Sequence, residues 1–451
     1  GGDSGHVRMI VFQNDSPVIA DAGETLSFSE NAGATVIDGN LSVVDVDDTN
    51  LESATITITS GYVVDEDVLG FTTQNGISGN WNSVSGVMTL SGTSSKANYE
   101  TALESVSYDN TSNDPNTSAR TITWSVQDGD SNSSSVTSTI NVTAVNDVPT
   151  LGDAGGTLFY TENDGVKAID DNLSVADVDN ANLKSATITI SSGYVSGEDV
   201  LGFTPQNGII GSWDSGAGVL SLNDEASIID YETALMSVTY NNTSEDPGTN
   251  ARTITWVLND GVGNSSGVTS TISVTALNDA PTLSVNTGAS VAEAASVIIS
   301  ALMLKEGDPD DSGSELTYWV TNAPSNGQLE LTTDEGVEIT NFTQADIDNN
   351  RLIYVHNGSE TIGDSFDFSL TDGGENAVLA LIGTFSIAVT AVNDVPTLGN
   401  AGGTLLYTEN DGAKAIDDIL SVGDVDDANL ELATITISAG YVSSEDVLGF
   451  S

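Results

Sequence analysis

The chain has 451 residues, of which 66 are acidic and 9 are basic, so its formal charge is −57. A surface this acidic repels nucleic acids and anionic membranes, and neither is expected as a partner. The absence of cysteine excludes a disulfide scaffold, a thiol nucleophile and a cysteine zinc site. No apolar stretch approaches the roughly 20 residues of a membrane-spanning helix, so no membrane insertion is expected in this segment.

A short motif, Asn-Asp-x-Pro, recurs along the chain and divides it. Its prolines stand at positions 17, 149, 281 and 396, at intervals of 132, 132 and 115 residues. A fixed period of this size indicates an array of similar domains. We call the four motifs the first to fourth joints; they begin at Asn14, Asn146, Asn278 and Asn393.

The joints predict the domain boundaries. Residues 17–148 and 149–280 form repeats one and two, residues 281–395 form a divergent repeat three, and residues 396–451 form the first half of repeat four. Residues 1–16 are interpreted as the last strand of a preceding repeat, because residues 7–13 align with residues 139–145. Phe450 corresponds to Phe203, in the middle of a repeat, so we expect a longer array or strands supplied by another chain.

The full repeats are predicted to be all-β. Residues 185–191 alternate apolar and polar side chains, and residues 252–258 have the same period with Ile254 and Trp256 inward. Further strands of repeat two are expected at 157–161, 173–175, 219–222, 237–240 and 268–276, and a short turn of helix at 228–236. Short strands at regular spacing, separated by Gly, Asn, Asp and Ser, are typical of a sandwich of two antiparallel sheets.

Four acidic positions recur in register. They are the joint itself, a glutamate about 13 residues later, an Asp-x-Asp pair, and an Asp-Gly near the end of each full repeat. The glutamates are Glu30, Glu162, Glu293 and Glu409; the pairs are Asp45/Asp47, Asp177/Asp179, Asp308/Asp310 and Asp424/Asp426; the late aspartates are Asp128, Asp260 and Asp372.

Calcium binding is the chemistry that this set suggests. Calcium requires six to eight oxygen ligands at roughly 2.3–2.6 Å, which carboxylates and amides supply. Asp-x-Asp in an extended loop would place both carboxylates on one side, because side chains alternate. Asp-Gly and Asn-Asp are also ordinary turn residues, which is the alternative explanation. The recurrence of all four positions in the divergent repeat three favours calcium.

These motifs resemble the calcium motifs of cadherin domains. Repeats one, two and four look like the cadherin-like repeats of giant bacterial surface adhesins. Repeat three is similar to the chondroitin sulfate proteoglycan type, through residues 342–347 and 354–356. The resemblance implies a tandem array of cadherin-like, Ig-like β-sandwiches that forms an elongated rod, with Ca2+ bound at each joint.

The resemblance also implies a ligand set for each joint. The second joint would use Asn146, Asp147, Glu162, Asp177, Asp179 and Asp260, and the third Asn278, Asp279, Glu293, Asp308, Asp310 and Asp372. The same rule gives Asn14, Asp15, Glu30, Asp45, Asp47 and Asp128 for the first joint, and Asn393, Asp394, Glu409, Asp424 and Asp426 for the fourth. The preceding repeat is expected to add Glu100 to the second joint and Glu232 to the third. Thr143 stands where a cadherin joint has its first aspartate, so one or two ions per joint are expected.

The predicted function is a calcium-rigidified stalk or filament segment of a large extracellular or cell-surface adhesion protein. Its partners would be neighbouring repeats of the same chain and other copies in a filament. The alternative is repeats that bind a carbohydrate or cell-surface ligand, with Trp81 and Trp213 in glycine-rich loops as candidate contacts unless they cap the core. No enzyme is expected, because the chain has only two histidines and no recognisable nucleophile partner for either. Ice binding through Thr55 to Thr59 is not favoured, because the Thr-x-Thr run occurs once per repeat.

Overall fold

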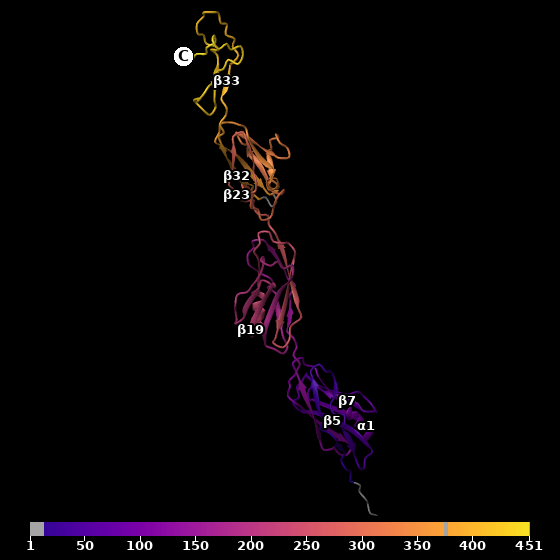
Figure 1. Ribbon diagram of the computed structural model, residues 1–451. Helices are drawn as coiled ribbons and strands as arrows, with labels where there is room; N and C mark the ends of the chain where they lie inside the picture. The colour runs from indigo at the N-terminus through magenta and orange to yellow at the C-terminus, as the bar shows by residue number, and fades with distance from the viewer. Residues whose placement is uncertain (1–12, 374–377, 451) are drawn as a thin grey trace, which may run out of the picture. The chain divides into compact units, whose positions relative to one another are not determined.

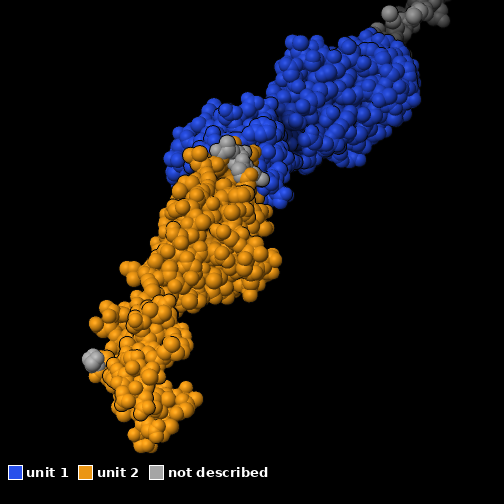
Figure 2. Space-filling model, turned by 90° about the horizontal axis from the view of Figure 1, so that it is seen from above, with its two compact units in different colours: residues 1–160, 164–243, 249–274 blue, residues 161–163, 244–248, 275–451 orange. Residues whose placement is uncertain are grey.

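The computed structural model describes residues 13–373 and 378–450 (Figure 1). The strand predicted at residues 7–13 lies almost wholly outside the described residues. The chain divides into two compact units, residues 1–160, 164–243 and 249–274 in one, and residues 161–163, 244–248 and 275–451 in the other (Figure 2). Three hydrophobic core clusters fall within residues 19–142, 151–274 and 291–389. The exact domain boundaries remain a prediction.

The first unit contains two very similar sets of strands, each with one short helix. The first set is β1 (Val18–Ala20), β2 (Thr25–Ser29), β3 (Thr35–Val36), β4 (Ser42–Val44), β5 (Asn50–Ser60), β6 (Asp67–Gly70), β7 (Ser78–Asn82), β8 (Val87–Ser95), α1 (Lys96–Glu104), β9 (Ser107–Asn110), β10 (Arg120–Gln127) and β11 (Val136–Thr143). The second set is β12 (Thr150–Gly152), β13 (Thr157–Thr161), β14 (Lys167–Ala168), β15 (Ser174–Ala176), β16 (Asn182–Ser192), β17 (Asp199–Gly202), β18 (Ile210–Asp214), β19 (Val219–Ser227), α2 (Ile228–Met236), β20 (Thr239–Asn242), β21 (Arg252–Asn259) and β22 (Val268–Thr275).

The second unit contains the divergent repeat and two further short strands. Its elements are β23 (Leu283–Asn286), β24 (Ala289–Ala292), β25 (Ser296–Ile298), β26 (Leu304–Glu306), β27 (Thr317–Asn322), β28 (Gly327–Leu331), β29 (Asn341–Thr343), α3 (Gln344–Asp348), β30 (Leu352–His356), β31 (Gly363–Thr371), β32 (Leu381–Thr390), β33 (Thr397–Gly399) and β34 (Ser421–Gly423). Among the described residues after 396, β33 and β34 are the only strands, and most side chains are exposed.

Each full repeat is built on two main sheets. Repeat two has a six-stranded sheet in the order β13-β22-β21-β16-β19-β18 and a three-stranded sheet in the order β14-β20-β17. Repeat one has the same pattern, β2-β11-β10-β5-β8-β7 and β3-β9-β6. Repeat three has five strands, β24-β32-β31-β27-β29, over three, β25-β30-β28. Both sheets of a repeat contribute to one core, so the predicted β-sandwich is confirmed.

In repeats one and three, one strand pairing is parallel and decides where the acidic residues lie. β2 runs parallel to β11, with Ser29 opposite Thr143, and β24 runs parallel to β32, with Ala292 opposite Thr390. The next pairings in the same sheets, β11 with β10, β10 with β5, β32 with β31 and β31 with β27, are antiparallel. Strands that run parallel end at the same edge of a sheet. The residue after β2 or β24 therefore lies beside the point where the chain leaves the repeat.

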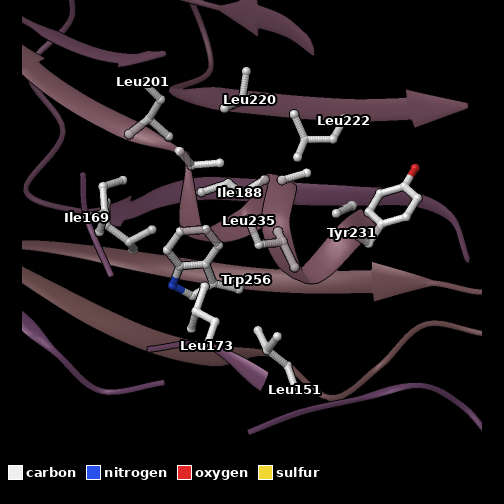
Figure 3. Close-up of a cluster of buried hydrophobic side chains, with 14 of the residues drawn as sticks. Leu151, Ile169, Leu173, Ile188, Leu201, Leu220, Leu222, Tyr231, Leu235 and Trp256 are labelled. Atoms are coloured by element: carbon white, nitrogen blue, oxygen red, sulfur yellow. The ribbon is translucent and has the colours of Figure 1, made fainter. Parts of the chain in front are cut away.

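The core of repeat two shows why the alternating pattern folds in this way (Figure 3). Trp256 and Ile254 are fully buried, as predicted, and Leu201 and Tyr240 reach the same cluster from the smaller sheet. The indole N–H of Trp256 donates to Ser270 Oγ at 3.0 Å, so that its polar atom is satisfied inside the core. The predicted helix is also confirmed as α2, whose N-cap Ser227 accepts from Asp230 N.

The two tryptophans proposed as ligand contacts pack on the cores. Trp81 and Trp213 are partly buried against them, and each ring makes an edge-to-face contact, with Tyr62 and Tyr194 respectively, at a centroid distance of 6.2 Å. Pairs of this geometry add to hydrophobic burial. This arrangement favours the core-capping role over a free binding surface.

Candidate metal centres at the joints

At the first three joints, hydrogen bonds hold the Asn-Asp pair to the repeat that follows it. At the second joint, Asn146 Nδ2 donates to Asp260 Oδ2 at 2.8 Å, and the Asp147 amide donates to the carboxylate of Asp179. The same bonds recur at the first joint (Asn14 to Asp128 at 3.1 Å, Asp15 to Asp47 at 3.2 Å) and the third (Asn278 to Asp372 at 2.8 Å, Asp279 to Asp310 at 2.6 Å). The predicted association of joint, Asp-x-Asp and late Asp is therefore present.

The Asp-x-Asp segment is a turn, so the expectation of an extended loop is wrong. Asp177 Oδ1 accepts from the amides of Asp179 (3.0 Å) and Asn180 (2.8 Å). Asp45, Asp308 and Asp424 accept the corresponding pairs of bonds. An aspartate that bonds backbone two and three residues later closes a local turn. The turn directs the second aspartate to the linker amide and brings the next residue back beside the first.

That next residue is a ligand candidate that the sequence prediction missed. Asp45, Asp48 and Asp128 place one carboxylate oxygen each within 4.8 Å of one another, and so do Asp308, Asp311 and Asp372. We call these sets the aspartate groups. The signal was visible in the sequence, since Asp45-x-Asp47 and Asp308-x-Asp310 are each followed directly by a further aspartate.

The recurring glutamate belongs to the joint that follows its repeat, not to the joint that precedes it. Glu162 Oε2 accepts from Leu277 N at 2.9 Å, Glu30 Oε2 from Val145 N at 2.8 Å, and Glu293 Oε2 from Val392 N at 3.3 Å. The parallel pairing of β2 with β11 and of β24 with β32 causes this placement. The predicted assignments of Glu30 to the first joint, Glu162 to the second and Glu293 to the third are thus wrong. Glu409 is exposed.

The extra glutamate expected from the preceding repeat comes from another element. Glu245, between β20 and β21, groups with Glu162 and Asp279, and Glu360, between β30 and β31, groups with Glu293 and Asp426, in each case within 4.8 Å. We call these sets the glutamate groups.

The proposed Glu100 and Glu232 lie elsewhere. They accept from Val43 N and Val175 N of their own repeats, at 3.1 and 3.0 Å. Their assignment to the second and third joints is therefore corrected.

Several carboxylate oxygens at the joints are buried without a hydrogen-bond partner among the described residues. At the second joint these are Asp147 Oδ2, Asp177 Oδ2 and Asp179 Oδ1, and Asp45 Oδ2 and Asp308 Oδ2 are equivalent atoms at the first and third. A buried charged oxygen that lacks a donor is costly. The donor set consists of carboxylate and amide oxygens, which fits a hard divalent cation such as calcium.

Mutual repulsion is evident at the third and fourth joints. Burial, followed by the charge of Asp279, raises the pKa of Glu162 above its usual value, and burial together with Asp310 does the same for Asp279. Partial desolvation and the neighbouring charges of Glu293, Asp426 and Asp394 raise the pKa of Glu360 to about 7. Like charges held this closely disfavour the ionised form unless a cation neutralises them.

Hydrogen bonds act in the opposite direction on the late aspartates. Burial alone would raise the pKa of Asp260, but the bonds from Asn146, Gly263 and Val262 outweigh it, and the pKa lies below its usual value. Hydrogen bonds from Ser131, Asn14 and Asp130 lower the pKa of Asp128 in the same way. These two aspartates stay charged, which suits a ligand role.

Glu360 is expected to make the calcium-free protein more stable at mildly acidic pH. Because its folded-state pKa is raised to about 7, the folded state binds a proton more tightly than the unfolded state. This contribution is present below the unfolded pKa and is lost as the pH rises through about 7. The midpoint of thermal unfolding, measured in a chelator between pH 5 and 8, should fall less steeply for Glu360→Gln than for the parent chain.

The exposed Glu335 of the same repeat provides the matched control. Glu335→Gln should retain the parent pH dependence. Equal slopes for Glu360→Gln and the parent would contradict the linkage.

Within the described part of the chain, no helix has the length and apolar character needed to cross a membrane. Residues 281–389 match the family model described as cadherin-like. Among curated proteins, the chain is 26% identical over 350 residues to halomucin of Haloquadratum walsbyi, covering 69% of this chain and 4% of that protein.

Two animal proteins are also similar to this chain. Human extracellular matrix organizing protein FRAS1 is 34% identical over 133 residues, which is 29% of this chain and 3% of that protein. Rat chondroitin sulfate proteoglycan 4 is 38% identical over 104 residues, which is 22% of this chain and 4% of that protein. The chain thus spans only a few per cent of the length of these relatives.

Solved cadherin ectodomains are also similar. The protocadherin gamma B2 extracellular cadherin domains 1–5 align at 15% identity with a TM-score of 0.35, covering 85% of this chain and 61% of that chain. Mouse cadherin-23 EC22–24 aligns at 16% identity with a TM-score of 0.34, covering 84% and 100%. The predicted resemblance to cadherin-like repeats is confirmed by the family match of residues 281–389 and by the similarity to the curated relatives.

Proposed function

We propose that this chain is a structural segment of a large extracellular adhesion or matrix protein, in which calcium binds at the joints and stiffens the array. The observation that carries the proposal is the recurrence at the joints of buried carboxylate oxygens without donors, such as Asp147 Oδ2 and Asp177 Oδ2 at the second joint, beside carboxylate groups close enough to share one ion at the first, third and fourth joints. The extracellular location agrees with relatives such as the extracellular matrix organizing protein FRAS1.

The chain's own residues already define the path of each linker. Val145 N donates to Glu30 from the preceding repeat, and Asp147 N donates to Asp179 from the following one. Proline at position 149 removes a donor and restricts the backbone after the joint. Bound calcium would supply positive charge that neutralises the carboxylates and links both sides of the joint. Without it, the same carboxylates repel one another and the linker is free to bend.

The proposed domains follow the joints, with neighbouring repeats as the principal partners and residues 17–148, 149–280, 281–395 and 396–451 as the units of the rod. A carbohydrate-binding role for repeats one and two is less favoured, because Trp81 and Trp213 pack on the cores. We do not propose catalysis, because the matches are to a cadherin-like family model and to proteins such as the extracellular matrix organizing protein FRAS1.

Calcium removal tests the proposal. At a free calcium concentration about ten times the dissociation constant, each site should add about 1.4 kcal/mol to the free energy of unfolding. The midpoint of thermal unfolding and the maximum dimension from small-angle X-ray scattering should therefore both fall when a chelator is added, and both should recover with calcium.

Magnesium is the control for non-specific charge screening. It prefers a small octahedral site with several retained waters, so magnesium at the same concentration should restore less of either quantity. If the chelator changes neither the unfolding midpoint nor the dimension, the proposed function is wrong.

A further inference from the structure

The second and third joints differ at two equivalent positions. The residue after Asp-x-Asp is Asp311 at the third joint and Asn180 at the second. The loop residue of the preceding repeat is Glu245 at the third joint, and its counterpart 132 residues earlier is Asn113. Each difference replaces a carboxylate by a neutral amide.

The backbone around the first difference is the same at both joints. Asn180 N donates to Asp177 Oδ1 at 2.8 Å, and Asp311 N donates to Asp308 Oδ1 at 3.0 Å. The side chains act differently. Asp311 places an oxygen in the aspartate group, whereas Asn180 Nδ2 donates to Asn146 Oδ1 at 3.1 Å and so engages a linker oxygen that could otherwise face a cation.

These two differences give the second and third joints different numbers of carboxylates. The second joint gathers five carboxylates, those of Glu30, Asp147, Asp177, Asp179 and Asp260. The third gathers the five equivalents, Glu162, Asp279, Asp308, Asp310 and Asp372, and adds Glu245 and Asp311, which makes seven. Both a glutamate group and an aspartate group lie at the third joint; among the described residues, neither occurs at the second.

We infer that the second and third joints fill at different calcium concentrations, the third before the second. The inference rests on the proposed function and adds an order to it. Calcium affinity in protein sites rises with the number of charged ligands, so the midpoint at the second joint should lie about tenfold or more above that at the third. Between these two concentrations the second joint is the calcium-dependent hinge of the segment, while the third is already rigid.

The full chain can be tested because it contains no cysteine. One pair of spin labels, at Thr101→Cys and Thr233→Cys, spans the second joint, and another, at Thr233→Cys and Thr333→Cys, spans the third. All three positions are exposed. Distance distributions from pulsed electron spin resonance are recorded during a calcium titration. The distribution across the third joint should narrow at about tenfold lower calcium than that across the second.

The matched controls are variants in which the second joint receives the two carboxylates of the third, and the third receives amides in their place. Asn180→Asp with Asn113→Glu should lower the calcium midpoint of the second joint toward that of the third, and Asp311→Asn with Glu245→Gln should raise the midpoint of the third. A common midpoint for both joints, or midpoints that the exchanges do not move, would overturn the ranking alone. If neither distribution narrows at any calcium concentration, the proposed function fails as well.

Discussion

Replacing Arg120 by methionine is expected to destabilise repeat one by about 3–5 kcal/mol, the usual cost of leaving a buried charge without its partner. The Arg120 guanidinium is fully buried and donates to both oxygens of Asp67, through Nε at 3.2 Å and Nη2 at 3.0 Å. It also donates through Nη1 to the carbonyl oxygens of Asn116 and Ser118, and so fixes the loop before β10.

The remaining contacts of Asp67 explain why methionine cannot substitute. Tyr108 donates its hydroxyl to Asp67 at 2.5 Å and Asn110 its side-chain amide at 3.0 Å, and both residues are buried. Burial, with this bond to Asp67, raises the pKa of Tyr108 well above its usual value. These neutral donors hold the carboxylate in place but do not balance its charge, which stays buried when the guanidinium is removed.

Denaturant unfolding measures the effect. The transition of repeat one should move to lower denaturant in Arg120→Met, and the double variant with Asp67→Asn should recover part of the loss, because the unpaired charge is gone. Lys184→Met is the control, since Lys184 pairs with Glu225 at a half-exposed site and such pairs contribute about 1 kcal/mol or less. Equal losses for Arg120→Met and Lys184→Met would contradict the argument.

Glu162→Gln is expected to maintain or raise the stability of the calcium-free protein but to weaken calcium binding at the third joint. The side chain is 3% exposed, and burial and nearby carboxylates raise its pKa. Glutamine keeps an acceptor for Leu277 N but carries no charge, so the calcium-free protein should be as stable as the parent or more so. A charged ligand at the third joint is lost, however, and calcium affinity there should fall by at least about tenfold.

The readout is the rise in unfolding midpoint between chelator and saturating calcium, together with the calcium concentration at half-effect. In Glu162→Gln the half-effect concentration of the third joint should increase while that of the second stays unchanged. Glu30→Gln, the equivalent change at the second joint, should do the reverse. If Glu162→Gln instead altered the second joint, the original sequence-based assignment of this glutamate would be correct after all.

The sequence alone predicted the sandwich because its signals are local. Alternation in residues 185–191 identifies the face of β16 that is buried, since side chains of a strand point to opposite sides. Recurrence at fixed intervals identified the repeats and most acidic positions at the joints. Gly129, Gly261 and Gly373 have positive φ of 110°, 103° and 94°, as the Asp-Gly turns require.

The buried ion pair and the additional aspartates of the aspartate groups could be predicted only in part from the sequence. Asp67 and Arg120 recur as Asp199 and Arg252, but a separation of 53 residues carries no local signal of contact. Asp48 and Asp311 follow Asp-x-Asp directly, and only the turn closed by Asp45 or Asp308 shows that they fold back into the aspartate group.

The amino-acid sequence by itself determined the all-β fold, the repeat and the acidic residue types at its joints, because periodicity and composition act along the chain. Only the tertiary structure decided which joint each glutamate serves. Glu30 lies closer in sequence to the first joint, yet the parallel pairing of β2 with β11 carries it to the second, 115 residues away. A strand's direction relative to its sheet neighbour is fixed by packing across the whole sandwich, and no local pattern records it.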